Sequence, residues 1–224
     1  MGRRARLIVV DFDGTITERD MLVDMCRRHA PEVFERVEND LRAGRITLRE
    51  CIRQEFEAIR GEHCEIVDAA VARATVRAGF ADFVSDAQAV GDEVVIVSSG
   101  FESVIRPVLE RAGVDEVELI AHEVRFSPAR TVVTFRHGDD VCSVCGQECK
   151  RSVVQRLDGG RSVVYVGDGY SDRCAALDAD RRFARRSLAR YLDQQGVDYS
   201  PFDDFDQIRH ALYGAESGEA AAGR

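Results

Sequence analysis

The chain has 224 residues, 45% hydrophobic and 32% charged, a composition typical of a globular protein with one large domain or a core and a small second lobe. Its net charge of −9 argues against nucleic acid as the main partner, because proteins that bind nucleic acid usually present a basic face. The longest apolar runs, such as LIVV and VVIV, are too short to cross a bilayer, so we expect no membrane association.

The first predicted element is a buried strand over residues 6–10, RLIVV, which runs directly into the loop DFDGT. Residues 15–79 then change character. Four stretches carry apolar residues at helical spacing, and Pro31 and two glycines separate them. We therefore predict a helical insertion at 15–79, inside a core domain made of residues 1–14 and 80–213.

Strands and helices alternate through the rest of the chain, which favours an α/β fold with an open, mostly parallel sheet and helices on both faces. The arginine-rich stretch 181–186 is interpreted as a solvated surface, and the tail 214–224 is predicted to be disordered. The pattern predicts strands at 93–99 and 161–167, a hairpin of 117–126 and 131–137, and helices at 80–90, 101–113, 147–160, 172–180, 187–195 and 203–213.

Polar side chains follow three of the predicted strands: Asp11 and Asp13 the first, Ser98 the second, and Asp168 and Asp172 the third. Ligands of such sheets bind outside the carboxyl ends of the strands, so we expect these side chains on one rim. Four carboxylates in one cleft repel each other unless a cation lies among them, and oxygen ligands favour Mg²⁺. The rim therefore predicts a site for Mg²⁺ and a phosphate group, with the helical insertion as its lid.

Phosphoryl transfer gives these residues roles. A carboxylate can attack phosphorus to form an aspartyl-phosphate, and Asp11 is the candidate. Asp13 can protonate the leaving alcohol and later activate water. The Ser98 side chain and the amides of Ser99 and Gly100 are expected to bind phosphate at the start of the following helix.

Lys150 is the only lysine among the 31 basic residues of the chain. A lysine is a compact point charge, whereas an arginine is a planar fork. We therefore predict that Lys150 holds the phosphoryl oxygens and the nucleophile.

DFDGTIT, VSSG, the isolated Lys150 and GDGYSD resemble the four ordered motifs of the haloacid-dehalogenase superfamily of phosphatases. The insertion is similar to the helical C1 cap of that superfamily. The resemblance implies a Rossmann-like core, with Asp11 as nucleophile and Asp13 as acid and base. It also implies that Asp11, the backbone carbonyl of Asp13 and Asp168 ligate Mg²⁺, with Asp172 in support. The second Asp of DFD argues against a dehalogenase.

Within the superfamily, residues 30–50, the segment before Lys150 and residues 198–212 resemble the methionine-salvage phosphatases. The substrate expected from this is 2-hydroxy-3-keto-5-methylthiopentenyl-1-phosphate or a related small phosphate, acted on by a monomer or homodimer. The alternatives are phosphoserine, phosphoethanolamine or phosphocholine, or a phosphate of a specialised biosynthetic pathway. Glu18 is near the position where phosphoserine phosphatases hold the substrate amine, or it is simply a first-turn helix residue. The cap lacks the Met–Gly, Phe and Arg pattern of those enzymes.

Three cysteines, Cys142, Cys145 and Cys149, precede Lys150, and His137 lies upstream of them. One interpretation is a structural Zn²⁺ site that holds the loop before Lys150, since such sites use four ligands of this kind. The other is that the thiols are reduced and partly buried as small apolar groups. Seven cysteines without a signal peptide favour a cytoplasmic protein. The remaining four are predicted to be packing residues: Cys26, Cys51, Cys64 and Cys174.

Two further functions stay open at this point. The same chemistry could pass phosphate to an alcohol or sugar, as in a phosphotransferase or mutase. A zinc-binding interaction protein without catalytic activity is the alternative from another class.

Overall fold

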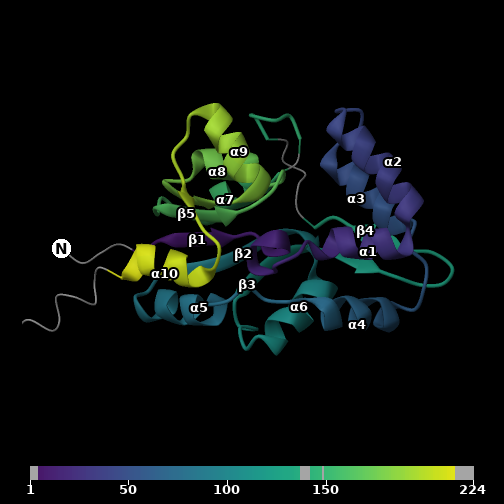
Figure 1. Ribbon diagram of the computed structural model, residues 1–224, viewed down its shortest axis with the longest axis horizontal. Coiled ribbons are helices and arrows are strands. Elements are labelled where there is room, and N and C mark those ends of the chain that lie inside the picture. The colour runs from purple at the N-terminus through teal and green to yellow at the C-terminus, as the bar shows by residue number, and fades with distance from the viewer. Residues whose placement is uncertain (1–4, 137–141, 148, 215–224) are drawn as a thin grey trace, which may run out of the picture.

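One sheet forms the centre of the computed structural model, which describes residues 5–136, 142–147 and 149–214 (Figure 1). Its strands are β1 (Leu7–Val10), β2 (Glu93–Phe101), β3 (Glu118–Arg125), β4 (Val132–Thr134), β5 (Val163–Gly167), β6 (Arg181–Ala184) and β7 (Ser200–Pro201). Among the described residues they lie in the order β4-β3-β2-β1-β5-β6-β7. Every neighbouring pair is parallel except β3 and β4, which form the predicted hairpin. The predicted α/β class and mostly parallel sheet are confirmed.

The first strand lies in the middle of the sheet. Val10, its last residue, pairs with Ile96 of β2 on one side and with Val166 of β5 on the other. All four residues of β1 are buried, as the central strand of a parallel sheet requires. Because the three strands run in the same direction, the segments that follow them meet at one edge of the sheet.

Helices cover both faces of the sheet (Figure 1). On one face, Ile8 and Val10 pack in a core with α5, α6 and α10; on the other, Leu7 and Val9 pack with α7, α8 and α9. The alternation of β1 side chains between the two cores follows from the period of two in a strand. The helices are α1 (Met21–His29), α2 (Pro31–Arg42), α3 (Leu48–Glu57), α4 (His63–Arg73), α5 (Phe80–Ala89), α6 (Glu102–Arg111), α7 (Lys150–Leu157), α8 (Arg173–Asp178), α9 (Arg186–Gln195) and α10 (Phe205–Tyr213).

The four helices predicted between β1 and α5 are present, at one end of the molecule (Figure 1). Polar caps explain where they begin. The Asp20 side chain accepts a hydrogen bond from the backbone N–H of Val23, and Thr47 caps α3 in the same way. Pro31 is the first residue of α2, where its missing N–H costs nothing.

Two segments connect this insertion to the sheet, and they lie side by side. Thr17 and Val76 form an isolated antiparallel bridge between them. The side chain of the buried Arg77 donates hydrogen bonds to four backbone carbonyls, those of Gly14, Thr15, Thr17 and Asp203. One guanidinium therefore ties both connections to the core.

The structure corrects the interpretation of residues 181–186 as a solvated surface. Arg181 begins β6, and Phe183 in that strand is buried in the core. Arg182 donates to the backbone carbonyls of Ala176, Leu177 and Ala179. Only two apolar residues of β6 are buried, so the strand was too short and too basic to be recognised, and β7 was also missed.

The last residues of the chain were predicted to form a disordered tail. Of the predicted tail 214–224, Gly214 directly follows α10, and residues 215–224 lie outside the described residues. Among the described residues, no helix combines the length and apolar character needed to span a membrane.

Candidate active site

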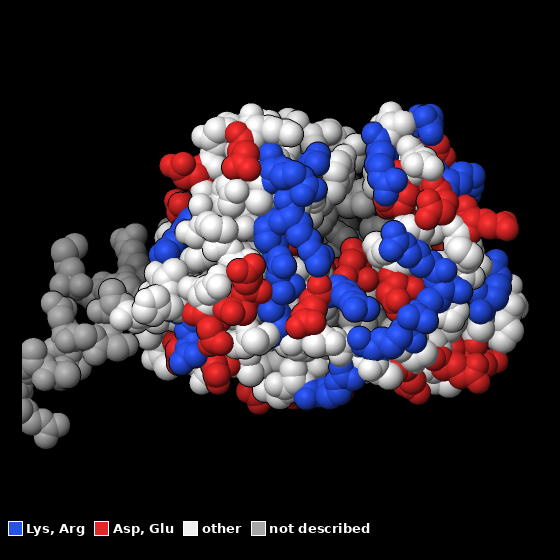
Figure 2. All heavy atoms as spheres, viewed as in Figure 1, with Lys and Arg blue, Asp and Glu red and all other residues white. Residues whose placement is uncertain are grey.

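A cavity of about 590 Å³ lies at the carboxyl ends of β1, β2 and β5. Residues after these strands form one wall, and side chains of α1, α2 and α3 form the facing wall. Figure 2 shows a hollow on this side of the molecule, with basic side chains on both sides of it. The core wall contains six residues that were predicted for the site: Asp11, Asp13, Ser98, Ser99, Gly100 and Asp168.

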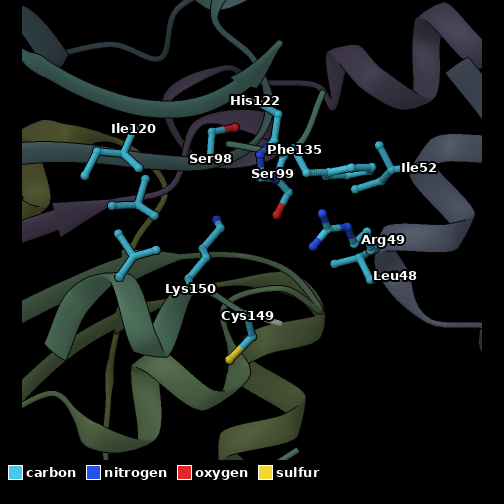
Figure 3. A pocket seen from close by; sticks show the side chains of 12 residues that line it. Leu48, Arg49, Ile52, Ser98, Ser99, Ile120, His122, Phe135, Cys149 and Lys150 are labelled. Carbon is cyan, nitrogen blue, oxygen red and sulfur yellow. The ribbon is translucent and has the colours of Figure 1, made fainter. Parts of the chain in front are cut away.

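Lys150 is the first residue of α7 and is only 4% exposed. Its ammonium donates to Asp172 Oδ1 at 2.7 Å and also to Asp11 Oδ1. Burial disfavours the charge, but the carboxylates of Asp11 and Asp172 outweigh it and raise the pKa of Lys150. In Figure 3 the Lys150 side chain points toward Ser98 and Ser99, as a phosphate-binding cation would.

Asp172 holds this arrangement in place. Its Oδ1 also accepts from the Tyr165 hydroxyl at 2.8 Å, and its Oδ2 accepts from the backbone N–H groups of Asp168 and Gly169. The carboxylate is completely buried, and its four donors satisfy both of its oxygens.

Three acidic side chains are close enough to share a cation. One carboxylate oxygen each from Asp11, Asp168 and Asp172 lies within 4.8 Å of the others. Burial, with the nearby Asp172, raises the pKa of Asp11, and the same two causes raise that of Asp168 to about 7. The cluster therefore holds more negative charge than Lys150 alone offsets, and its oxygen-only donors fit Mg²⁺.

Asp13 lies beside this cluster on the same loop. Its Oδ1 accepts from the backbone N–H of Met21 at 2.8 Å. Burial and the nearby Asp20 raise the pKa of Asp13, which favours its protonated form. A Cβ on Gly100 would lie 3.1 Å from Asp13 Oδ2, so this glycine leaves room for the acid.

The segment predicted to bind phosphate has a different local structure from the one expected. Strand β2 continues through Ser98, Ser99 and Gly100 to Phe101, and α6 begins only at Glu102. The pairing of β2 with β3 shifts register between Val97 and Phe101. Ser98 Oγ accepts from the backbone N–H of Gly100 at 2.9 Å. The predicted residues line the cavity, but at an irregular strand end and not at a helix N-terminus.

Residues 8–177 match the sequence profile of the haloacid dehalogenase-like hydrolase family. The chain belongs to this family. Proteins named 2-hydroxy-3-keto-5-methylthiopentenyl-1-phosphate phosphatase are similar to it. The one from Brevibacillus brevis is 30% identical, over 92% of this chain and 94% of its own, and the one from Exiguobacterium sp. is 29% identical, over 92% and 97%.

Solved structures of phosphoserine phosphatases share the fold of this hydrolase. One, a phospho-aspartyl intermediate analogue, has a TM-score of 0.70 at 20% identity and covers 92% of this chain and 98% of its own. Another, from T. onnurineus, has a TM-score of 0.69 at 18% identity and covers 93% and 94%. The family match confirms the predicted superfamily, and these structures confirm its fold.

Three more residues near the acidic rim of this hydrolase, Glu18, Asp20 and Arg186, lie differently from what the sequence indicated. Glu18 is exposed and absent from the cavity lining, whereas Asp20 lies in it. Arg186, assigned to the solvated surface, donates to Asp168 Oδ2 at 3.3 Å and to the Glu18 carbonyl at 3.0 Å. Asp20 carried a signal, since Asp before an apolar run is a preferred helix cap. Arg186 carried none.

Glu55 of α3 is the most unusual of the residues that the sequence did not indicate. It lines the cavity, is 6% exposed, and its Oε1 has no hydrogen-bond partner among the described residues. Burial and the nearby Glu38 raise the pKa of Glu55 to about 7. The sequence did hold one signal for Glu55. It is a charged residue among Cys51, Ile52 and Phe56, the apolar residues that α3 buries.

The structure adds a fourth cysteine to the three predicted as zinc ligands. Among the described residues, Cys174 lies beside Cys142, Cys145 and Cys149, and His137 lies outside the described residues. Of the residues predicted to serve packing alone, Cys26 and Cys51 are buried, whereas Cys64 is exposed.

Proposed function

We propose that this hydrolase is a Mg²⁺-dependent phosphomonoesterase that acts on a small metabolite through an aspartyl-phosphate. The observation that carries the proposal is the buried network of Asp11, Lys150 and Asp172, in which Asp11 lines the cavity together with Asp13. Sequence relatives over 92% of the chain are phosphatases by name, which supports it.

In the first step an Asp11 carboxylate oxygen forms a bond to phosphorus, and the bond from phosphorus to the substrate alcohol breaks. Asp13, whose raised pKa keeps its carboxyl protonated, donates its proton to the departing oxygen. Lys150 orients Asp11 and faces the phosphoryl oxygens together with Ser98 and Ser99. Bound at Asp11, the Asp13 carbonyl and Asp168, Mg²⁺ would supply charge neutralisation for the phosphoryl group.

In the second step Asp13, now ionised, takes a proton from water. The water oxygen bonds to phosphorus, and the bond between phosphorus and Asp11 breaks, which releases phosphate and restores the enzyme. Asp172 touches no reacting group in this scheme. It positions Lys150 and the backbone amide of Asp168.

We further propose that residues 15–79 form a cap and that residues 1–14 and 80–213 form the core. Apolar and acidic side chains of α1, α2 and α3 face the acidic rim across the cavity. The part of a substrate beyond its phosphate would therefore contact the cap. Leu22, Val23 and Ile52 offer it an apolar surface.

The relatives make 2-hydroxy-3-keto-5-methylthiopentenyl-1-phosphate the substrate proposed first, and the apolar cap residues suit its methylthio end. A specific observation favours a second class, small phosphates that carry a cation, such as phosphoethanolamine or phosphocholine. Glu38 and Glu55 lie on the cap side of the cavity. The pKa of Glu55 is raised to about 7 by burial and by Glu38, and a bound ammonium group would favour its ionised form and pair with it. The same two residues disfavour the carboxylate of phosphoserine.

The test is Mg²⁺-dependent phosphate release from a panel that contains these four phosphates and several sugar phosphates. Chelation should stop release, and added Mg²⁺ should restore it. Asp11→Asn should abolish turnover of every substrate without lowering the thermal midpoint, because the nucleophile is lost and the fold is not. Asp68→Asn, an exposed position on α4, is the matched control. Turnover by Asp11→Asn would rule out the aspartyl-phosphate, and phosphate transfer to an added alcohol in place of water would indicate a phosphotransferase.

A further inference from the structure

Four cysteine sulfurs gather near the start of α7, where Cys149 directly precedes the helix. The Sγ atoms of Cys142, Cys145, Cys149 and Cys174 all lie within 4.8 Å of one another. We propose that these four side chains bind one structural zinc ion. The site is distinct from the acidic rim and goes beyond the proposed phosphatase function.

The spacing of the sulfurs fits a tetrahedral ion. Zn–S bonds of about 2.3 Å place the sulfurs of a tetrahedral site roughly 3.8 Å apart, so small rotations of the side chains would close the cluster. All four cysteines are free thiols among the described residues. A set of four thiolates selects zinc over the hard Mg²⁺ expected at the rim.

The chain around the first two cysteines folds back as a ligand turn requires. Gly146 has a φ of +67°, in the left-handed region, and its N–H donates to the Cys142 carbonyl at 2.8 Å. The backbone N–H of Cys142 donates to the Gln147 carbonyl at 2.9 Å. The N–H of Val144 points at Cys142 Sγ at 3.4 Å, where it would offset part of the negative charge of a thiolate. The C-x2-C spacing of Cys142 and Cys145 is typical of structural zinc sites.

The ion would join two segments that both supply the acidic rim. Cys149 directly precedes Lys150, and Cys174 comes two residues after Asp172. Figure 3 shows a pocket beside the cavity, lined by Ser98, Cys149 and Lys150, in which the Cys149 sulfur and the Lys150 ammonium point in opposite directions. Since Lys150 and Asp172 form an ion pair at 2.7 Å, a zinc ion behind them would fix both halves of that pair. The four cysteines would thus position Lys150 and Asp172.

Metal analysis of the full-length purified protein tests the site without reference to any substrate. We expect one zinc per chain, carried through gel filtration. Cys145→Ser and Cys174→Ser should each lose the ion, because three thiolates bind it less tightly than four. Cys64→Ser, an exposed cysteine of α4 outside the cluster, should keep it, and so should Asp168→Asn at the rim. Zinc retained by Cys145→Ser and Cys174→Ser, or lost equally by Cys64→Ser, would overturn the assignment.

Cobalt provides a second readout that does not depend on whether the variants fold. Co²⁺ exchanged into the wild-type protein should give the visible absorption of a tetrahedral tetrathiolate site. Three results would each contradict the proposal. They are iron in place of zinc, a disulfide between any two of the four cysteines in the freshly purified reduced chain, and the lack of a tetrahedral cobalt spectrum. Removal of zinc should lower kcat more than it raises KM and should be reversed by added Zn²⁺. A protein that binds zinc in this way but releases no phosphate would refute the proposed function and leave the zinc site intact.

Discussion

Lys150 shows why one cation differs from the 30 arginines of this chain. It reaches Asp11 and Asp172 from the start of a helix, in a space with 4% exposure. A guanidinium is broader, and its planar fork would have to displace one of the two carboxylates. The site therefore depends on the shape of the cation as well as on its charge.

Glu55 should make stability depend on pH. The pKa of this carboxyl is about 7 in the folded protein against 4.5 for an ordinary glutamate, because burial and Glu38 disfavour its ionised form. The folded state therefore binds the proton more tightly than the unfolded state, and stability falls as pH rises from about 4.5 to about 7. The full effect is at most about 3 kcal/mol, at 1.36 kcal/mol per pKa unit.

Glu55→Gln should remove this dependence, since a neutral amide does not titrate. In urea unfolding, we expect the variant to match the wild type near pH 5 and to be more stable near pH 8. Glu65→Gln, an exposed position on α4, should change neither value. An unchanged pH slope in Glu55→Gln would show that the carboxyl is not held neutral by the fold.

At the scale of elements, the end of β5 holds Asp172 through close packing. A Cβ on Gly167 would lie 2.7 Å from Asp172 Cγ and 3.0 Å from Tyr165 Cε1. A Cβ on Gly169 would lie 3.7 Å from Asp172 Oδ2, an ordinary contact. Neither glycine has a positive φ, so the two positions differ in space and not in backbone strain.

Gly167→Ala should therefore displace Asp172, whereas Gly169→Ala should be tolerated. Overpacking of this kind costs about 1–3 kcal/mol of stability. A shifted Asp172 no longer positions Lys150, so kcat should fall by about 10–100-fold. Steady-state phosphate release and thermal unfolding of the two variants measure this. Equal effects of the two alanines would contradict the packing argument.

Elements with strong local patterns were predictable, and those defined by distant partners were not. Strands β1, β2 and β5 are runs of apolar, mostly β-branched residues that end in polar side chains, so the strands themselves and their common rim could be predicted. Strand β6 has arginines at two of its four positions and pairs through its backbone, which leaves no apolar pattern. The helical periodicity predicted α3 but did not indicate that its Glu55 faces a cavity.

At the scale of the whole molecule, contacts between distant parts of the chain also lack a local sequence pattern. Cys174 lies on α8, whereas the three cysteines near it precede α7, and Arg186 reaches Asp168 from the start of α9. No local pattern connects these pairs, because they are set by how α7, α8 and α9 pack on one face of the sheet. The motifs that follow β1, β2 and β5 were predictable, because parallel strands end at the same rim of the sheet.

Arg77 links the insertion, the loop after β1 and the C-terminal segment into one unit. Its guanidinium donates to carbonyls of residues 14, 15, 17 and 203, so it holds both connections of the insertion at once. Lysine cannot reproduce these bonds from one ammonium, and buried carbonyls without donors are costly. Arg77→Lys should lower the free energy of unfolding by at least about 2 kcal/mol.

Arg77→Lys should also speed amide hydrogen exchange at Thr17, Glu18 and Arg77, because the bridge between the two connections loses its support. Arg190→Lys, an exposed position on α9, controls for the general effect of the substitution. If the insertion moves relative to the core on that hinge, KM should rise more than kcat falls, since the cap residues meet the substrate before chemistry. A variant with wild-type exchange at these amides would show that the paired backbone alone, without Arg77, holds the insertion to the sheet.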